Sequence, residues 1–341
     1  MKLKPYYLGL VLLILLGLTA SSAFGVGSAG TITGGTFPAC VDPANTSTST
    51  VKIAGKQVAP GGLVRVPPPN AACLPSETTL KLNSYVKTIL VSPTGADNIA
   101  NGTLLQNAMN NATAGMLVKV EPGTYDLVTT PLIMKQGVDL EGSGEGLTTI
   151  TSQINITNAQ PPAGTVVITN SSEVRFLTIS NLGNSINYHT AVYASGVDKT
   201  AKLSNLTITT SGISDQNYGI FNNFSSPTIL NSTVTASGSN TQNYGIYNYG
   251  SEPKILNSTI TASGASYQNA GILNYTSYPI IQNSTITASD GSFYFSIFNT
   301  SSTTKVAGSQ LGAPVGSSGG LAFICVASYN SNFVALSPTC T

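Results

Sequence analysis

An internal repeat of 26 residues constrains this chain more than any other feature. Three segments align without gaps from Pro227, Pro253 and Pro279, and they read PTILNSTVTASG, PKILNSTITASG and PIIQNSTITASD. A second motif recurs at the same spacing as NYGIFN, NYGIYN and NAGILN, and AKLSNLTITTSG from Ala201 is a degenerate upstream copy. One such unit is too short to bury its own apolar side chains, so the units must stack on one another.

The repeated units have the composition of short β-strands. Isoleucine or valine occupies the same places in each copy, as at Ile229, Ile255 and Ile281, and Ser, Asn and Gly separate the apolar residues. No helical periodicity runs through them, which argues against ankyrin or tetratricopeptide repeats. We therefore predict an all-β fold: a parallel β-helix, or solenoid, with about 26 residues and two or three strands per coil.

Asparagine also recurs at fixed places. Its side chain can hydrogen-bond along a stack, and it tolerates left-handed backbone angles, so we expect two Asn columns at coil corners. The columns are Asn205, Asn231, Asn257 and Asn283, and then Asn222, Asn248, Asn274 and Asn299. Many of these residues match the N-x-Ser/Thr glycosylation pattern. We interpret the match as a by-product of the repeat, with glycosylation as the alternative in a host that glycosylates secreted proteins.

The chain is nearly uncharged. Asp, Glu, Lys and Arg make up 8% of its 341 residues, and the formal net charge is +1, which excludes a nucleic-acid binder that relies on a basic surface. One histidine and four cysteines argue against a multi-ligand zinc site, and we predict no metal and no cofactor. Stacking like charges in successive coils would be repulsive, so the low charge is partly a consequence of the repeat.

The N-terminus has the pattern of a secretory signal peptide. Lys2 and Lys4 precede an apolar run over residues 8–20, and small residues allow cleavage after Ala23 or Gly25. An uncleaved N-terminal anchor is the alternative. We predict a secreted bacterial protein that is extracellular, periplasmic or attached to the cell surface, with no membrane span after cleavage.

The cysteines form an even set of four: Cys40, Cys73, Cys325 and Cys340. In an exported chain this predicts two disulfides with three possible connectivities. The simplest connectivity joins Cys40 to Cys73 and Cys325 to Cys340. Free thiols are the alternative, which an oxidising compartment disfavours.

Residues 87–150 resemble the entry to the pectin lyase-like β-helix superfamily, which includes pectin methylesterases and pectate lyases. EPGTYD is similar to the family's pGtY turn, and LEGSGEGLTTI is similar to its l.G.G...T.I coil. The resemblance extends over about residues 88–310 and implies a right-handed β-helix with a short N-terminal capping helix, expected over 103–110. The tail LAFICVASYNSNFVALSPTC resembles the ends of secreted bacterial β-helix proteins of unassigned function.

Four segments follow from these patterns. We expect a signal peptide over 1–23, a Pro/Gly-rich extension with Cys40 and Cys73 over 24–86, the β-helix over 87–310, and a C-terminal cap with Cys325 and Cys340 over 311–341.

The catalytic motifs of the resembling families do not carry over. The segment from Thr190 to Ala194, TAVYA, is similar to the Gln-Ala-Val-Ala-Leu segment of pectin methylesterases, with Thr190 in the place of Gln. The later Asp-Phe-Ile-Phe-Gly and Arg-Pro-Trp segments have no counterpart, and Trp is absent. Neither the clustered calcium-binding Asp of pectate lyases nor the paired Asp of polygalacturonase-like hydrolases is found.

Four residues remain as catalytic candidates: Asp139, Glu141, Arg175 and His189. With Glu145, the two acids form the densest acidic cluster, which suits a calcium site or an acid/base pair. Alternation points both acids outward, and we expect Arg175 in the column of Asp139 one coil later, so surface ion pairs are the favoured interpretation. For His189, a general base is possible, but we favour a loop histidine.

The repeat also predicts a row of large outward side chains. Since Ile220, Ile246 and Ile272 point inward, their neighbours point outward. We expect a flat ridge about 20 Å long, because coils are separated by about 4.8 Å, and we assign it as the ligand-binding site: Tyr193, Phe221, Tyr247, Leu273 and Phe298. Aromatic faces stack on sugars, and an exposed apolar strip usually marks a binding site. Coverage by the N-terminal segment is the alternative.

Our leading hypothesis is a non-enzymatic module that binds polysaccharide or a surface partner, or has a structural role. The alternative is a divergent polysaccharide lyase, carbohydrate esterase or glycoside hydrolase. An autotransporter passenger is disfavoured because the chain has no room for a translocating barrel after the repeats. Trimeric association and other oligomeric states stay open, as does the identity of the ligand.

Overall fold

The computed structural model describes residues 87–156, 163–183, 187–319 and 323–341, together with the backbone of short strands between residues 30 and 81. The chain forms two compact units, of which Thr31–Thr88 is one. That unit contains a three-stranded antiparallel sheet and a two-stranded one. The strands before residue 82 are β1 (Gly30–Ile32), β2 (Pro38–Val41), β3 (Val51–Ile53), β4 (Lys56–Val58), β5 (Val64–Arg65) and β6 (Thr78–Lys81).

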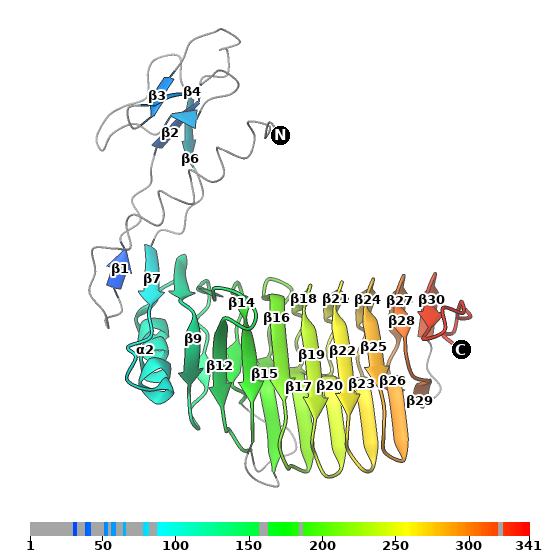
Figure 1. Cartoon of the computed structure of the whole chain (residues 1–341). Coiled ribbons are helices and arrows are strands. Elements are labelled where there is room, and N and C mark those ends of the chain that lie inside the picture. Colours follow the sequence, from blue (N-terminus) through cyan, green and yellow to red (C-terminus); the bar gives the residue numbers. More distant parts are fainter. Residues whose placement is uncertain are drawn as a thin grey trace, which may run out of the picture. The chain divides into compact units, whose positions relative to one another are not determined.

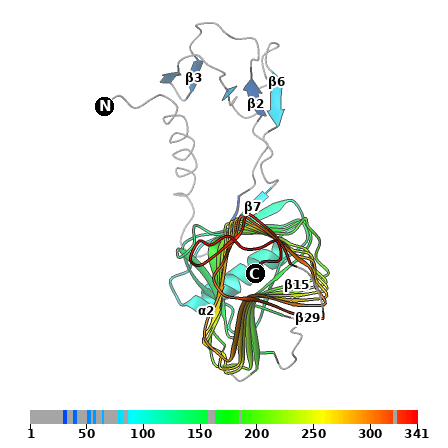
Figure 2. The same cartoon turned by 90° about the vertical axis from the view of Figure 1, so that its right-hand side faces the viewer.

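The larger unit is a right-handed parallel β-helix of about eight coils, with roughly 26 residues per coil. The coils stack side by side in Figure 1 and superimpose when viewed along the axis in Figure 2. This confirms the fold predicted from the repeat. Every regular coil contributes three strand segments, so the stacked coils form three parallel ladders, and each ladder presents one outer face.

The first and second ladders belong to one continuous sheet, in which β14 and β16 each contribute to both. After the opening strand β7 (Lys87–Val91), the first ladder consists of β8 (Met116–Val120), β11 (Asp139–Glu141), the first halves of β14 (Glu173–Asn181) and β16 (Lys202–Thr210), β18 (Thr228–Leu230), β21 (Lys254–Leu256), β24 (Ile280–Gln282), β27 (Thr304–Ala307) and β30 (Phe323–Val326).

The second ladder consists of β9 (Gly123–Asp126), β12 (Thr148–Ser152), the second halves of β14 and β16, β19 (Thr233–Ser237), β22 (Thr259–Ser263), β25 (Thr285–Ala288), β28 (Gln310–Leu311) and β31 (Tyr329–Asn330). The third ladder is a separate sheet of β10 (Leu132–Ile133), β13 (Val166–Ile168), β15 (Tyr188–Ser195), β17 (Gln216–Asn223), β20 (Gln242–Tyr249), β23 (Gln268–Tyr275), β26 (Phe293–Thr300) and β29 (Val315–Ser318).

The core is built from registered columns of β-branched side chains. In the second ladder, Ile208, Val234, Ile260 and Ile286 lie over one another and have no exposed surface. Matching columns run inside the other two ladders, through Ile229 and Ile220 respectively. Burying one such side chain contributes about 1.5–3 kcal/mol, so identical side chains in successive coils explain why the repeat folds as a stack.

Asparagine makes the corner between the first and second ladders. Asn205, Asn231, Asn257 and Asn283 have φ of 49–52°, a left-handed conformation that asparagine tolerates better than most residues. Their amides approach one another at 3.3–3.4 Å where an interaction is formed. The second predicted column lies within the third ladder instead of at a corner. It is buried, and its Asn–Asn hydrogen bonds of 2.8–2.9 Å link Asn222, Asn248, Asn274 and Asn299.

The capping helix is longer than the sequence indicated. Helix α2 spans Asn98–Asn111, whereas we expected 103–110, because Asp97 caps its start by accepting a hydrogen bond from the Ala100 N–H. It lies at the N-terminal end of the coils (Figure 1). Gly102 allows the close contact with β9, since a Cβ there would lie 2.0 Å from the Asp126 carbonyl oxygen.

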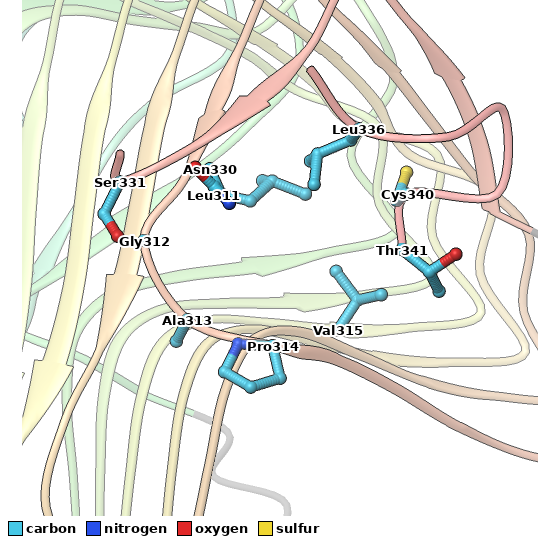
Figure 3. A pocket seen from close by; sticks show the side chains of 10 residues that line it. All are labelled: Leu311, Gly312, Ala313, Pro314, Val315, Asn330, Ser331, Leu336, Cys340 and Thr341. Atoms are coloured by element: carbon cyan, nitrogen blue, oxygen red, sulfur yellow. The ribbon is translucent and has the colours of Figure 1, made fainter. Parts of the chain in front are cut away.

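The C-terminal tail folds back over the last coil. A disulfide joins Cys325 to Cys340, as predicted, and the Cys325 N–H donates to the Pro338 carbonyl at 2.8 Å. The tail and the last coil border an open cavity of about 390 Å³, lined mainly by apolar residues such as Leu311, Val315 and Leu336 (Figure 3). The predicted Cys40–Cys73 pair and the predicted signal peptide lie outside the residues whose side chains are described. None of the described helices is long and apolar enough to cross a membrane.

Candidate binding surfaces

The five ridge residues share one column on the outer face of the third ladder. Tyr193, Phe221, Tyr247, Leu273 and Phe298 are paired in register through successive strands, opposite the core isoleucines. They belong to a hydrophobic cluster that is distinct from the core. The rings of Phe221 and Tyr247 stack at 4.9 Å with 8° between their planes.

The ridge is open only in part. Phe221 has no exposed surface and Tyr193 is 7% exposed, while Tyr247, Leu273 and Phe298 are half-buried. Tyr193 and Phe221 form the buried part of the ridge, where their rings pack on each other with centroids 5.7 Å apart. The flat exposed ridge expected over five coils is therefore shorter: its accessible side chains belong to the last three.

A second row of tyrosines, itself buried, packs beside this ridge, and the sequence analysis missed it. Tyr218 and Tyr244 lie in adjacent strands, and both rings pack against Tyr247 at 5.7–5.9 Å. Simple alternation from Ile220 would place the Tyr218 side chain inside the coil. Gly219, however, turns its side-chain position inward, since a Cβ there would lie 2.4 Å from the core residue Val234. The alternation is broken at this glycine, and the NYG part of the repeated NYGI motif is the signal that marks it.

Burial keeps these phenols neutral. It raises the pKa of Tyr218 and of Tyr244 well above the ordinary value, and it raises the pKa of Tyr247 to about 12, with the nearby Tyr249 and Tyr275 adding to the effect. Their hydroxyls therefore act as hydrogen-bonding groups: the Tyr244 hydroxyl donates to Gln268 Oε1 at 3.0 Å. The buried rings of Tyr218 and Tyr244 therefore support the ridge from beside it, and its accessible part stays Tyr247, Leu273 and Phe298.

Another aromatic pair lies along the rim of the same face. Tyr249 and Tyr275 stack at 5.2 Å with 5° between their planes, and Tyr275 is 41% exposed. We define the aromatic face as the ridge together with these flanking tyrosines: Tyr193, Tyr218, Phe221, Tyr244, Tyr247, Tyr249, Leu273, Tyr275 and Phe298.

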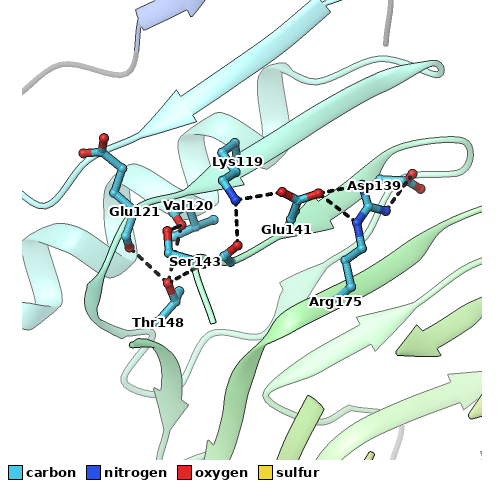
Figure 4. Close-up of polar contacts among 9 residues, drawn as sticks. Lys119, Val120, Glu121, Asp139, Glu141, Ser143, Thr148 and Arg175 are labelled. Atoms are coloured by element: carbon cyan, nitrogen blue, oxygen red, sulfur yellow. Dashed lines mark hydrogen bonds and ion pairs between the residues drawn. The ribbon is translucent and has the colours of Figure 1, made fainter. Parts of the chain in front are cut away.

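Three of the four catalytic candidates meet on the outer face of the first ladder. The register pairs Glu141 with Arg175, so Asp139 lies opposite Glu173, and our expectation that Arg175 shares the column of Asp139 is wrong. Arg175 nevertheless reaches both acids, with contacts of 2.8 Å to Glu141 and 3.3 Å to Asp139 (Figure 4). It also contacts Glu173 at 3.2 Å.

This group of residues is an ion-pair network between coils. Lys119 Nζ donates to Glu141 Oε1 at 2.7 Å, and the Ser204 hydroxyl donates to Glu173 at 2.6 Å. Burial alone raises the pKa of Glu141. The hydrogen bonds and charges of Lys119 and Arg175 lower that pKa by more than burial raises it, so it lies below its ordinary value. The carboxylates of Asp139, Glu141 and Glu173 therefore pair with the cationic side chains of Lys119 and Arg175.

The remaining acid and the histidine lie elsewhere. Glu145 accepts a hydrogen bond from the Thr207 hydroxyl at 2.8 Å, and among the described residues no group of three or more His, Cys, Asp or Glu side chains is placed to hold a metal ion. His189 is not a loop histidine: it lies in β15 with no exposed surface. Its ring nitrogens contact Asn217 Oδ1 at 3.1 Å and Asn155 Oδ1 at 2.6 Å, which separates it from the Arg175 network.

No protein-family model and no curated protein matches the chain. Solved structures with a similar fold include the pectin methylesterase from Yersinia enterocolitica, at 15% identity and a TM-score of 0.46 over 69% of this chain and 91% of that one. The fold is also similar to pectin methylesterase PemA from Erwinia chrysanthemi, at 12% identity and a TM-score of 0.39 over 73% of this chain and 91% of that one. An alginate lyase from Paenibacillus sp. str. FPU-7 matches at 11% identity and a TM-score of 0.39 over 71% of this chain and 95% of that one. These similarities are too distant to indicate an activity.

Proposed function

We propose that this chain is a secreted or surface-associated β-helix protein that binds polysaccharide, without chemistry, through its aromatic face. The observation that carries the proposal is the partly exposed row of Tyr247, Leu273 and Phe298, flanked by the stacked pair of Tyr249 and Tyr275. Ring faces bind the apolar faces of sugar rings, and neutral hydroxyl and amide groups beside them bind sugar hydroxyls. The disulfide between Cys325 and Cys340 supports an oxidising, extracytoplasmic location.

The shape of the face favours an extended ligand. Its side chains recur once per coil, at about 4.8 Å, in a line along the axis of the β-helix. A polymer with a sugar ring at regular intervals can contact several of these side chains at once. A single sugar would contact one or two and gain little affinity.

Affinity electrophoresis and pull-down on a panel of soluble and insoluble polysaccharides test this proposal. We expect Tyr247→Ala to weaken binding about tenfold or more, since buried aromatic anchors contribute roughly 2 kcal/mol or more to interfaces. Phe333→Ala is the matched control, because Phe333 is 77% exposed but lies in the C-terminal tail. Equal binding by both variants, or no binding of the wild type across the panel, would contradict the proposal.

One observation favours the second candidate, a divergent polysaccharide lyase, esterase or hydrolase. Asp139, Glu141 and Arg175 are brought together, and Asp139 lines a depression of about 280 Å³ with Glu173 and Lys202. Turnover of pectins or alginate that is lost in Arg175→Lys, while the variant keeps the wild-type melting temperature, would establish this function. Absence of turnover with the wild-type protein would exclude it for those polymers.

A further inference from the structure

The second ladder presents a regular array of threonine hydroxyls, which we call the hydroxyl face. Each of four successive coils contributes a Thr-x-Thr pair with an inward Ile or Val between the two threonines. The pairs are in strict register, so two straight columns result: Thr207, Thr233, Thr259 and Thr285, and Thr209, Thr235, Thr261 and Thr287. Ser237 and Ser263 continue the same alternation beyond the pairs in two of these coils.

The array is open over its last three coils. Thr233 and Thr259 are exposed, and their four partners in those coils are half-buried, as expected for side chains standing on a flat sheet. Towards the N-terminal end the loop of residues 142–147 lies over the face, where Glu145 accepts a hydrogen bond from Thr207 and the Gly146 N–H donates to Thr178. No charged residue occurs within β19, β22 or β25.

β-propensity alone does not account for this array. Threonine is common in strands because its branched side chain suits a pleated surface, but that preference acts equally on the first ladder of the same sheet. There the matching outward column reads Thr228, Lys254, Ile280 and Lys305. The outward residues of these coils therefore differ from coil to coil on the first ladder, whereas they stay threonine on the second.

The hydroxyl face is also rigid and periodic in two directions. Coils repeat at about 4.8 Å, and alternate residues of a strand at about 6.6 Å. Threonine is stiff about χ1, the backbone is paired on both sides, and the hydroxyls of Thr261 and Thr287 lie 3.1 Å apart. A soluble ligand with a few polar groups gains nothing from such long-range order, whereas a crystalline surface does.

We propose that the hydroxyl face binds ice. Threonines that repeat once per coil hold water through their hydroxyls, those of Thr261 and Thr287 as a hydrogen-bonded pair, and the methyl groups order the adjacent water without binding it. The rows of oxygen atoms in hexagonal ice repeat in two perpendicular directions at spacings of this size. An uncharged face suits this ligand, because charged groups hold hydration shells that do not fit an ice lattice. This function is independent of polysaccharide binding, which uses the third ladder.

The test uses the purified full chain. Partition of the protein into a slowly growing ice ball and inhibition of ice recrystallisation are compared with a reference protein of similar size. We expect the wild type to enrich in the ice and to slow recrystallisation. Thr261→Lys, in the centre of the array, should fall to the level of the reference protein. Thr228→Lys makes the same change on the first ladder, where the next coil already carries Lys254, and it should behave like the wild type.

Two further measurements keep the test decisive. Thr259→Gln places on the array a residue that the fold already accepts at Gln310 in the same column, so it tests the face even if the lysine variant fails to fold. Tyr247→Ala should keep ice binding and lose polysaccharide binding, which separates the two proposals. Exclusion of the wild type from ice, equal behaviour of Thr261→Lys and Thr228→Lys, or binding of insoluble polysaccharide through the threonines instead would each overturn the proposal.

Discussion

His189 occupies a place that asparagine fills in the next coils. It is in register with Asn217, Asn243 and Asn269, and all of these side chains are buried. The Asn217 amide nitrogen donates to the carbonyls of Gly212 and Ser237, so its oxygen faces His189 Nδ1, which is therefore the donor of that bond. The only histidine thus behaves as one more polar member of a column that links coils.

We expect His189→Asn to be tolerated and His189→Leu to destabilise the fold by about 1–3 kcal/mol, because leucine removes the contacts with Asn217 and Asn155 and leaves the Ser214 hydroxyl as the other donor to the buried Asn217 oxygen. Thermal unfolding followed by circular dichroism measures both changes. A leucine variant as stable as the asparagine variant would show that the contact with Asn217 contributes nothing.

Among the elements, the ion-pair network shows where sequence-based prediction stops. In the later coils, paired residues are 26 apart, and the strands, core columns and Asn corner could all be predicted from the repeat. Between β11 and β14, Glu141 pairs with Arg175, 34 residues later in the sequence. Between β14 and β16, Ser180 pairs with Thr209, 29 residues later. Loops of different length are inserted in these coils, so the column of Arg175 could not be found by counting. The sequence also could not show that rings from adjacent coils would cover Phe221.

The network also predicts a pH dependence. Lys119 and Arg175 hold the pKa of Glu141 below the ordinary 4.5. A carboxyl whose folded pKa is lowered contributes stability that is fully present above its unfolded pKa and is lost as the pH falls through its folded pKa. We expect Glu141→Gln to be less stable than the wild type at pH 7, and the difference to shrink as the pH falls below 4.5 and to disappear once the pH is below the folded pKa. Urea unfolding at several pH values measures it. Glu145→Gln is the exposed control, and a constant difference at all pH values would contradict the assignment.

At the scale of the whole molecule, one coil serves three surfaces at once. Each regular coil adds a variable pair to the first ladder, a Thr-x-Thr pair to the second and a large side chain to the third. Affinity on either proposed face therefore grows with the number of coils, because each coil adds contacts about 4.8 Å further along the axis. Repetition of the core and repetition of the binding groups are the same property of the sequence.

Removal of one whole coil tests this coupling. Deleting residues 243–268 joins Gln242 to Asn269, which occupies the register position of Asn243, so every ladder, the core columns and the Asn corner stay aligned. We expect a folded protein with lower stability, since coils contribute additively through their neighbours, and with weaker binding on both the aromatic face and the hydroxyl face. Deleting only 243–255 shifts every later strand out of its ladder and should prevent folding. Circular dichroism, urea unfolding and the two binding assays measure these outcomes, and a whole-coil deletion that unfolds the protein or weakens only one face would contradict the coupling.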